Sequence, residues 1–117
     1  MGEEKRQYVR WREKIQVAYV VEGEKQPYRE VFTEDVSEVG VLIDAFEELE
    51  SGQNVQLKIE FVYDSVPIMA RAKVMHVKKS EDRYKIGLEF LGLDDFQKQR
   101  FARYLEMIKK EHSQKAE

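Results

Sequence analysis

The sequence contains no cysteine and no long apolar run. Without cysteine the chain forms neither disulfides nor thiolate metal sites, which is typical of proteins kept in a reducing compartment. No apolar stretch approaches the roughly 20 residues that a membrane-spanning helix needs. The first 14 residues are charged and lack the apolar centre of a signal peptide. We therefore expect a soluble, cytoplasmic protein without membrane insertion.

Sequence motifs that are typical of catalytic sites are also missing. The sequence has no HExxH, GxSxG, P-loop or GxGxxG motif, and no second metal ligand stands at zinc spacing from a histidine. Of the two histidines, His76 falls on the inward face of a predicted strand and His112 falls in a polar tail that we expect to fray. These features predict a protein that is not an enzyme and holds no metal or cofactor.

The charge balance limits the choice of ligand. The net charge is −3, although 37% of the residues are charged. A domain that holds a nucleic-acid polymer is normally strongly basic, so RNA or DNA is not the expected partner. Residues 1–14 nevertheless carry five lysines and arginines against three glutamates, and this basic arm suits a small anion.

Alternation of apolar and polar residues predicts six short strands within one domain of 117 residues. Turn residues separate these strands, which is typical of an antiparallel sheet that closes on itself or forms a sandwich. The predicted strands cover about 15–21, 28–33, 39–46, 55–61, 68–76 and 84–90.

The period then changes to that of a helix with one apolar face. Asp94 is the expected N-cap, with Gln97 as its capping-box partner. The apolar face is expected to contain Phe96, Phe101, Tyr104, Leu105 and Ile108.

Two short motifs remain once the strands and the helix are assigned. "RQYVR" places Arg6 and Arg10 four residues apart, and "DVSEVG" contains Asp35, Ser37 and Gly40. The second motif could be only a bend, with a glycine that is free to adopt positive φ. If the first two strands form a hairpin, however, the arm and this bend meet at the same end of the sheet.

The chemistry of these side chains favours a guanine nucleotide. Arginine side chains bind phosphate oxygens and the O6/N7 edge of guanine with two hydrogen bonds. A carboxylate such as Asp35 can accept hydrogen bonds from guanine N1–H and N2–H₂, which adenine does not offer. Ser37 can add a hydrogen bond, and Gly40 lets the backbone approach.

On these two motifs, and on "SGQNVQLKIEF" and "YKIGLEFLGL", the sequence resembles the PilZ domain, a bacterial receptor for cyclic di-GMP. The resemblance implies a mainly β fold: a six-stranded antiparallel β-barrel of split-barrel type with a C-terminal α-helix. It also implies that Arg6, Arg10, Asp35, Ser37 and Gly40 bind the ligand.

Three further residues, Lys5, Trp11 and Gly87, are candidates for the same site. The position of Lys5 is associated in the family with ligand number, and a lysine there suggests two stacked molecules. Trp11 could stack on a base or close the mouth of the barrel.

The resulting hypothesis is a single PilZ-like domain over residues 1–117, with a flexible arm over 1–11, a barrel over about 12–92 and a helix over about 94–110. Cyclic di-GMP would order the arm, and the ordered surface would signal to an unidentified downstream protein. The chain could be a monomer or a homodimer. The alternatives are a PilZ-like adaptor that binds protein but no nucleotide and, less favoured by the charge, a small RNA-binding barrel.

Overall fold

The computed structural model describes residues 9–61 and 64–115. Arg6 and Lys5, and with them most of the predicted arm, lie outside this part of the chain. The described elements, in chain order, are β1 (Trp11–Arg12), β2 (Gln16–Val21), β3 (Arg29–Val36), β4 (Gly40–Ala45), β5 (Asn54–Phe61), β6 (Asp64–Ser80), β7 (Arg83–Gly92) and α1 (Asp95–Lys115).

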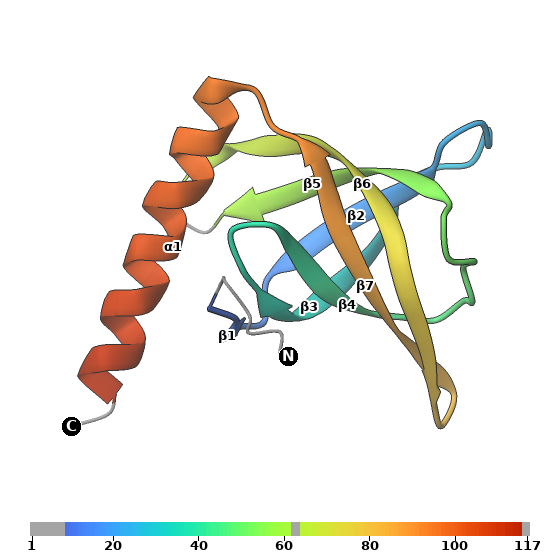
Figure 1. The fold of residues 1–117 in the computed structure, drawn as a ribbon, viewed down its shortest axis with the longest axis horizontal. Helices are drawn as coiled ribbons and strands as arrows, with labels where there is room; N and C mark the ends of the chain where they lie inside the picture. Colours follow the sequence, from blue (N-terminus) through green and yellow to red (C-terminus); the bar gives the residue numbers. More distant parts are fainter. Residues whose placement is uncertain (1–8, 62–63, 116–117) are drawn as a thin grey trace, which may run out of the picture.

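Six of the strands form a closed antiparallel barrel (Figure 1). Their order is β3-β2-β5-β6-β7-β4, and pairing between β3 and β4 closes the ring. Closure leaves no unpaired edge among these six strands, which is how a small all-β domain avoids edge-to-edge aggregation. The predicted six-stranded barrel with a C-terminal helix is therefore confirmed.

The short strand β1 lies outside the ring, on the same side of β3 as β2. Between β1 and β2 the chain is fastened by the buried side chain of Thr33. The Thr33 hydroxyl donates to the Glu13 carbonyl oxygen (2.6 Å) and accepts from the Ile15 amide (2.9 Å). The predicted arm therefore ends earlier than expected, because Trp11 already belongs to a strand.

Inward-facing apolar side chains fill the interior of the barrel and form the core. The largest of the fully buried side chains include Tyr19, Ile43, Leu57, Ile59, Ile68 and Ile86. They come from five different strands, as period-2 alternation requires when one face of each strand is buried.

Shifts in the strand register interrupt this alternation, and two of them, each a β-bulge, shape the surface described below. In β3 the pairing with β4 shifts between Thr33 and Asp35, and in β6 the pairing with β7 shifts between Val74 and His76. Each extra residue turns two consecutive side chains outward. The prediction that His76 faces inward is therefore wrong: the bulge at Met75 leaves His76 exposed.

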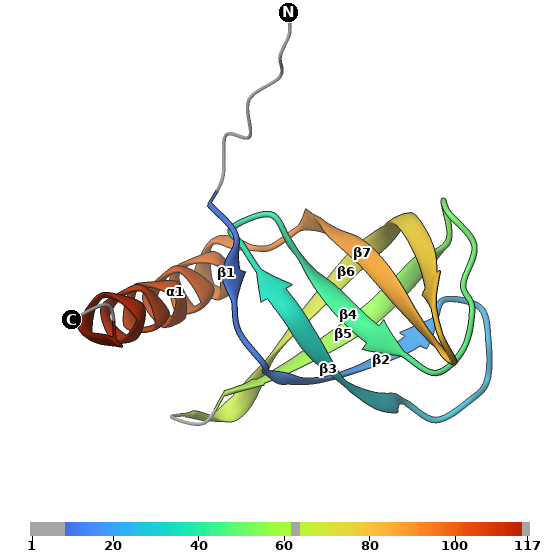
Figure 2. The same cartoon turned by 90° about the horizontal axis from the view of Figure 1, so that it is seen from below.

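Helix α1 lies beside the barrel (Figures 1 and 2) and packs on it through one stripe of side chains. Phe101, Tyr104, Leu105 and Ile108 are buried. Phe96, predicted on the same face, is 69% exposed, because it lies in the first turn before the helix reaches the core.

The predicted N-cap is confirmed, since the backbone N–H of Gln97 donates to Asp94 Oδ1 (2.8 Å). The helix continues to Lys115, five residues beyond the predicted end. The prediction that His112 frays is wrong, because its side chain is half-buried against β1.

Candidate functional site

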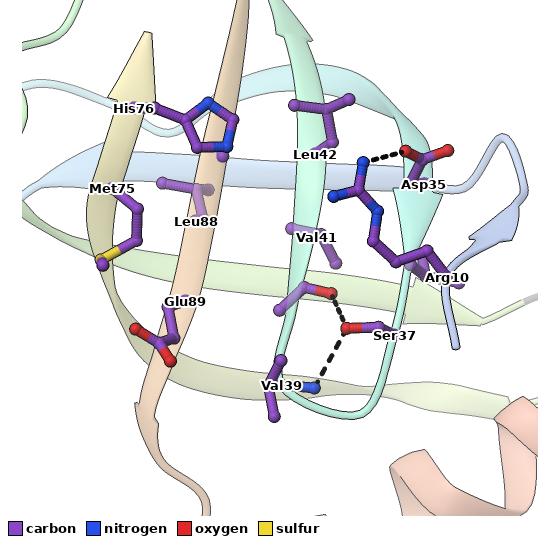
Figure 3. Close-up of a pocket in the computed structure, with 13 residues that line it drawn as sticks. Arg10, Asp35, Ser37, Val39, Val41, Leu42, Met75, His76, Leu88 and Glu89 are labelled. Atoms are coloured by element: carbon purple, nitrogen blue, oxygen red, sulfur yellow. Dashed lines mark hydrogen bonds and ion pairs between the residues drawn. The ribbon is translucent and has the colours of Figure 1, made fainter. Parts of the chain in front are cut away.

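A cavity of about 280 Å³ lies on the outer surface of the barrel, where four strands meet (Figure 3). The strand registers place Asp35 of β3 opposite Leu42 of β4, Leu42 opposite Gly87 of β7, and Gly87 opposite His76 of β6. These four residues therefore form one row across the sheet. Leu42 and Gly87 make the floor, and Asp35 and His76, each the residue directly after a bulge, stand at its two sides.

Arg10 and Asp35 form the charged side of this cavity. Arg10 Nη2 lies 3.2 Å from Asp35 Oδ2, and the Arg10 side chain is 44% exposed. The pairing of Arg12 with Asp35 in the β1–β3 ladder brings the end of the arm to this point. The prediction that the arm and the 35–40 motif meet at one end of the sheet is confirmed for Arg10.

Ser37 and Gly40 shape the cavity through the backbone. The buried Ser37 hydroxyl accepts from the Val39 amide (3.2 Å) and lies 3.4 Å from the Gly40 carbonyl oxygen, which also accepts from the Ser37 amide (2.9 Å). A side chain at Gly40 would overlap the carbonyl oxygen of Leu88 in β7. Gly40 does not adopt positive φ. The expectation of positive φ is thus wrong, and this glycine permits close approach of two strands.

The residues of the other wall were not predicted. Met75, His76 and Glu89 line the cavity on this side, and Leu42 of the floor was not predicted either. The His76 ring lies against Gly87, where any Cβ would overlap three of its ring atoms. A strict period of two hides His76, since a one-residue slip moves a side chain to the other face of a strand. Gly87, the only glycine within the last predicted strand, was the available signal.

Trp11 does not line the cavity. It packs on the core from β1, and its ring centroid lies 5.3 Å from that of His112. Of the two uses considered for Trp11, packing is therefore the one present in this structure.

Two negative observations apply to the described residues. Within 9–61 and 64–115, no three histidine, aspartate or glutamate side chains gather as a metal would require. In the same part of the chain, no helix is both long enough and apolar enough to cross a membrane.

Comparison with known proteins identifies the family. The family model for the PilZ domain matches residues 4–107. No curated protein matches the sequence.

Solved structures with the same fold include the Bacillus subtilis inhibitor of motility, MotI/DgrA, with a TM-score of 0.78 and 18% identity. The PilZ domain of YcgR from Escherichia coli, solved with c-di-GMP, has a TM-score of 0.73 and 14% identity. The K. pneumonia MrkH–c-di-GMP complex has a TM-score of 0.77 and 16% identity.

The match covers 98% of this chain and 55% of MotI, 97% and 98% for the YcgR domain, and 97% and 56% for MrkH. The chain thus spans just over half the length of MotI and of MrkH, and nearly all of the isolated YcgR domain. At these identities the structures establish the fold, and the family model covers most of the sequence. The chain belongs to the PilZ domain family.

Proposed function

We propose that this chain is a receptor for cyclic di-GMP that signals to a partner protein. The observation that carries the proposal is the cavity where Arg10 and Asp35 stand beside the floor of Leu42 and Gly87, in a PilZ domain. The YcgR and MrkH structures with this fold were solved with c-di-GMP.

The ligand offers two guanines and two negative charges, and the cavity offers matching groups. Asp35 accepts from guanine N1–H and N2–H₂, while Arg10 donates to a phosphate or to the O6/N7 edge. The base lies on Leu42 and Gly87, with His76 as the opposite wall. Three strand spacings separate the Cα atoms of Asp35 and His76, roughly 14 Å before the side chains reach inward.

To bind the ligand, Arg10 and Asp35 must break their ion pair and form new hydrogen bonds to ligand groups. Their pair is exposed, and an exposed ion pair contributes at most about 1 kcal/mol. Charge-assisted bonds to a desolvated ligand are stronger, at about 1.5–3 kcal/mol each. The exchange is therefore favourable, and the pair holds Arg10 near the site until the ligand arrives.

Ser37 and Gly40 support the ligand through the shape of the loop. The 3.4 Å contact between the Ser37 hydroxyl and the Gly40 carbonyl oxygen is long for a hydrogen bond, so this hydroxyl can turn to the ligand at small cost.

Arg6 and Lys5 enter the proposal through the sequence motif. Arg6 holds the second guanine or the phosphates, the arm becomes ordered on the ligand, and Lys5 favours two stacked molecules in the site.

Calorimetry with cyclic di-GMP tests the proposal. We expect saturable binding, which Arg10→Ala or Asp35→Ala weakens by about 2 kcal/mol, since each removes a charge-assisted partner. Arg12→Ala is the matched control, because this neighbouring arginine does not line the cavity. Cyclic di-AMP should not bind. The stoichiometry reports on Lys5, and an intact protein that ignores high micromolar cyclic di-GMP would contradict the receptor function.

An adaptor that binds protein without nucleotide is the second candidate, and one observation favours it. A hollow of about 370 Å³ lies beside α1, lined by Phe61, Phe96, Gln99, Arg100, Arg103, Tyr104 and Met107. Aromatic residues, arginine and methionine are the types enriched in protein interfaces. Partner binding that persists in Arg10→Ala and without nucleotide would favour this alternative.

A further inference from the structure

The contact between β1 and α1 joins the nucleotide site to the C-terminal end of the helix. His112 contacts Trp11 of β1 and Glu13, the residue that follows this strand. The ring centroids of Trp11 and His112 lie 5.3 Å apart, and His112 Nε2 lies 3.2 Å from Glu13 Oε1. Figure 1 shows β1 level with the C-terminal half of α1.

His112 continues the stripe that fastens α1 to the barrel. Phe101, Leu105, Ile108 and His112 follow one another at spacings of three or four residues, so they share one helix face. Ile108 is the last buried aliphatic residue of this stripe. One turn later, His112 contacts Trp11 of β1 and the adjacent Glu13. This contact accounts for the helical order of the residues beyond 110, where the polar sequence predicted fraying.

The same two-residue strand carries the first ligand group. Arg10 immediately precedes β1 and reaches Asp35, and Arg12 of β1 pairs with Asp35 in the ladder. On the other side, the Glu13 amide donates to the Glu34 carbonyl oxygen (3.0 Å), and Thr33 holds the Glu13 carbonyl. Glu13 is thus fixed to β3, whereas at the other end of β1, beyond the pairing of Trp11 with Val36, Arg10 contacts β3 through one exposed ion pair among the described residues.

We propose that β1 couples the nucleotide site to α1. The coupling rests on the proposed function: a ligand held by Arg10 fixes the weak end of β1 on β3, and the fixed β1 holds His112 and the last turns of α1 more firmly. Ligand occupancy is then reported at the C-terminal end of the helix, away from the cavity. Coupling between two sites is reciprocal, so loss of the His112 contact must also weaken ligand binding.

Amide exchange tests the contact without ligand. Trp11→Ala should accelerate exchange in residues 109–115, whereas Lys109→Ala, an exposed position on the same helix, should not. Cyclic di-GMP added to the intact protein should slow exchange in the same residues. Unchanged exchange in 109–115 on ligand saturation would overturn the coupling.

Calorimetry tests the reciprocal effect. His112→Ala should weaken cyclic di-GMP binding about fivefold, the lower end of common coupling factors, although His112 does not line the cavity. Lys109→Ala should bind like the intact protein. Glu13→Gln combined with His112→Ala should weaken binding by less than the product of the two single effects. The reason is that the two substitutions act on the same contact, the one between His112 and Glu13.

The outcomes separate the two proposals. If the intact protein does not bind cyclic di-GMP, the proposed function fails and the coupling fails with it. If the intact protein and His112→Ala bind with equal affinity, the receptor function stands and the coupling alone is overturned. A folded His112→Ala protein is expected, because the buried part of the stripe is retained.

Discussion

Two arginines at the two ends of β3 meet carboxylates in different ways. Arg29, at the start of the strand, contacts Glu47 through Nε (2.6 Å) and Gln26 through Nη2 (2.6 Å), and it lies over the ring of Tyr19. Arg10, at the far end, makes one ion pair at 3.2 Å among the described residues. Arg29 uses its Nε and Nη2 donors within the structure, while Arg10 uses one of its nitrogen atoms toward the described residues. Both belong to arginine–carboxylate pairs, so the number of partners, and not the presence of a pair, distinguishes Arg10, which we propose to bind the ligand, from Arg29.

The largest effect is expected at Gly40, which lines the same cavity as Arg10 but contributes to it through backbone packing and not through a charge. Gly40→Ala should lower the free energy of unfolding by about 3 kcal/mol, because its methyl group meets the backbone of Leu88 and a close-packed strand cannot yield. Urea denaturation measures this. Gly52→Ala is the control, since its Cβ would meet no atom within 4 Å and only its positive φ is strained, at about 1 kcal/mol. Equal losses in the two variants would contradict the proposed role of Gly40.

Exchanging the two arginines for alanine tests the comparison directly. Arg29→Ala should lower the free energy of unfolding by about 2 kcal/mol, since it removes several partners and the packing over Tyr19, and leave cyclic di-GMP affinity unchanged. Arg10→Ala should change the free energy of unfolding by less than about 1 kcal/mol, while its binding is weakened. Denaturation and calorimetry on the same two proteins decide the matter. A stability loss of similar size in Arg10→Ala would remove the distinction.

The smallest effect on the free energy of unfolding is expected from the ionisation of Tyr19, because it appears only at alkaline pH. Burial, and then the hydrogen bond to Glu47 (2.5 Å), raise the pKa of Tyr19 well above its ordinary value. The stabilisation is therefore fully present below pH 10, the ordinary tyrosine pKa, and is lost as the pH rises further. Above pH 10 the free energy of unfolding should fall faster than in Tyr19→Phe, by up to about 1.4 kcal/mol per pH unit. Denaturation curves from pH 8 to 11 measure the difference, and parallel curves would contradict the role of this proton.

The sequence predicted the barrel and the helix because both depend on regular periods. Val55, Leu57 and Ile59 alternate strictly, and Phe101, Leu105 and Ile108 follow a helical stripe, so burial of one face determines the element. The sequence also predicted that Arg10 and Asp35 meet, because an antiparallel hairpin brings those positions together.

The opposite wall of the cavity was not predicted, because its only local signal, Gly87, lies on the neighbouring strand and not beside the bulge. A β-bulge depends on pairing with the neighbouring strand, and nothing in the residues around Met75 marks the extra position. The predicted alternation therefore continued without interruption through Met75, and it placed His76 on the inner face of the strand instead of the outer face. The extended helix was missed for a similar reason: His112 is held by Trp11, which is distant in the sequence, and local propensity carries no record of that contact.

The two bulges have a consequence for how this surface can change in evolution. The pattern in β3 is Thr33 inward, Glu34 and Asp35 outward, and Val36 inward, and in β6 Val74 and Val77 face inward around Met75 and His76. Removing one residue from either bulge restores regular alternation and leaves every core position on its own face. Deletion of the single codon for Asp35 or for His76 can therefore remove one side of the cavity while the core positions around it keep their faces.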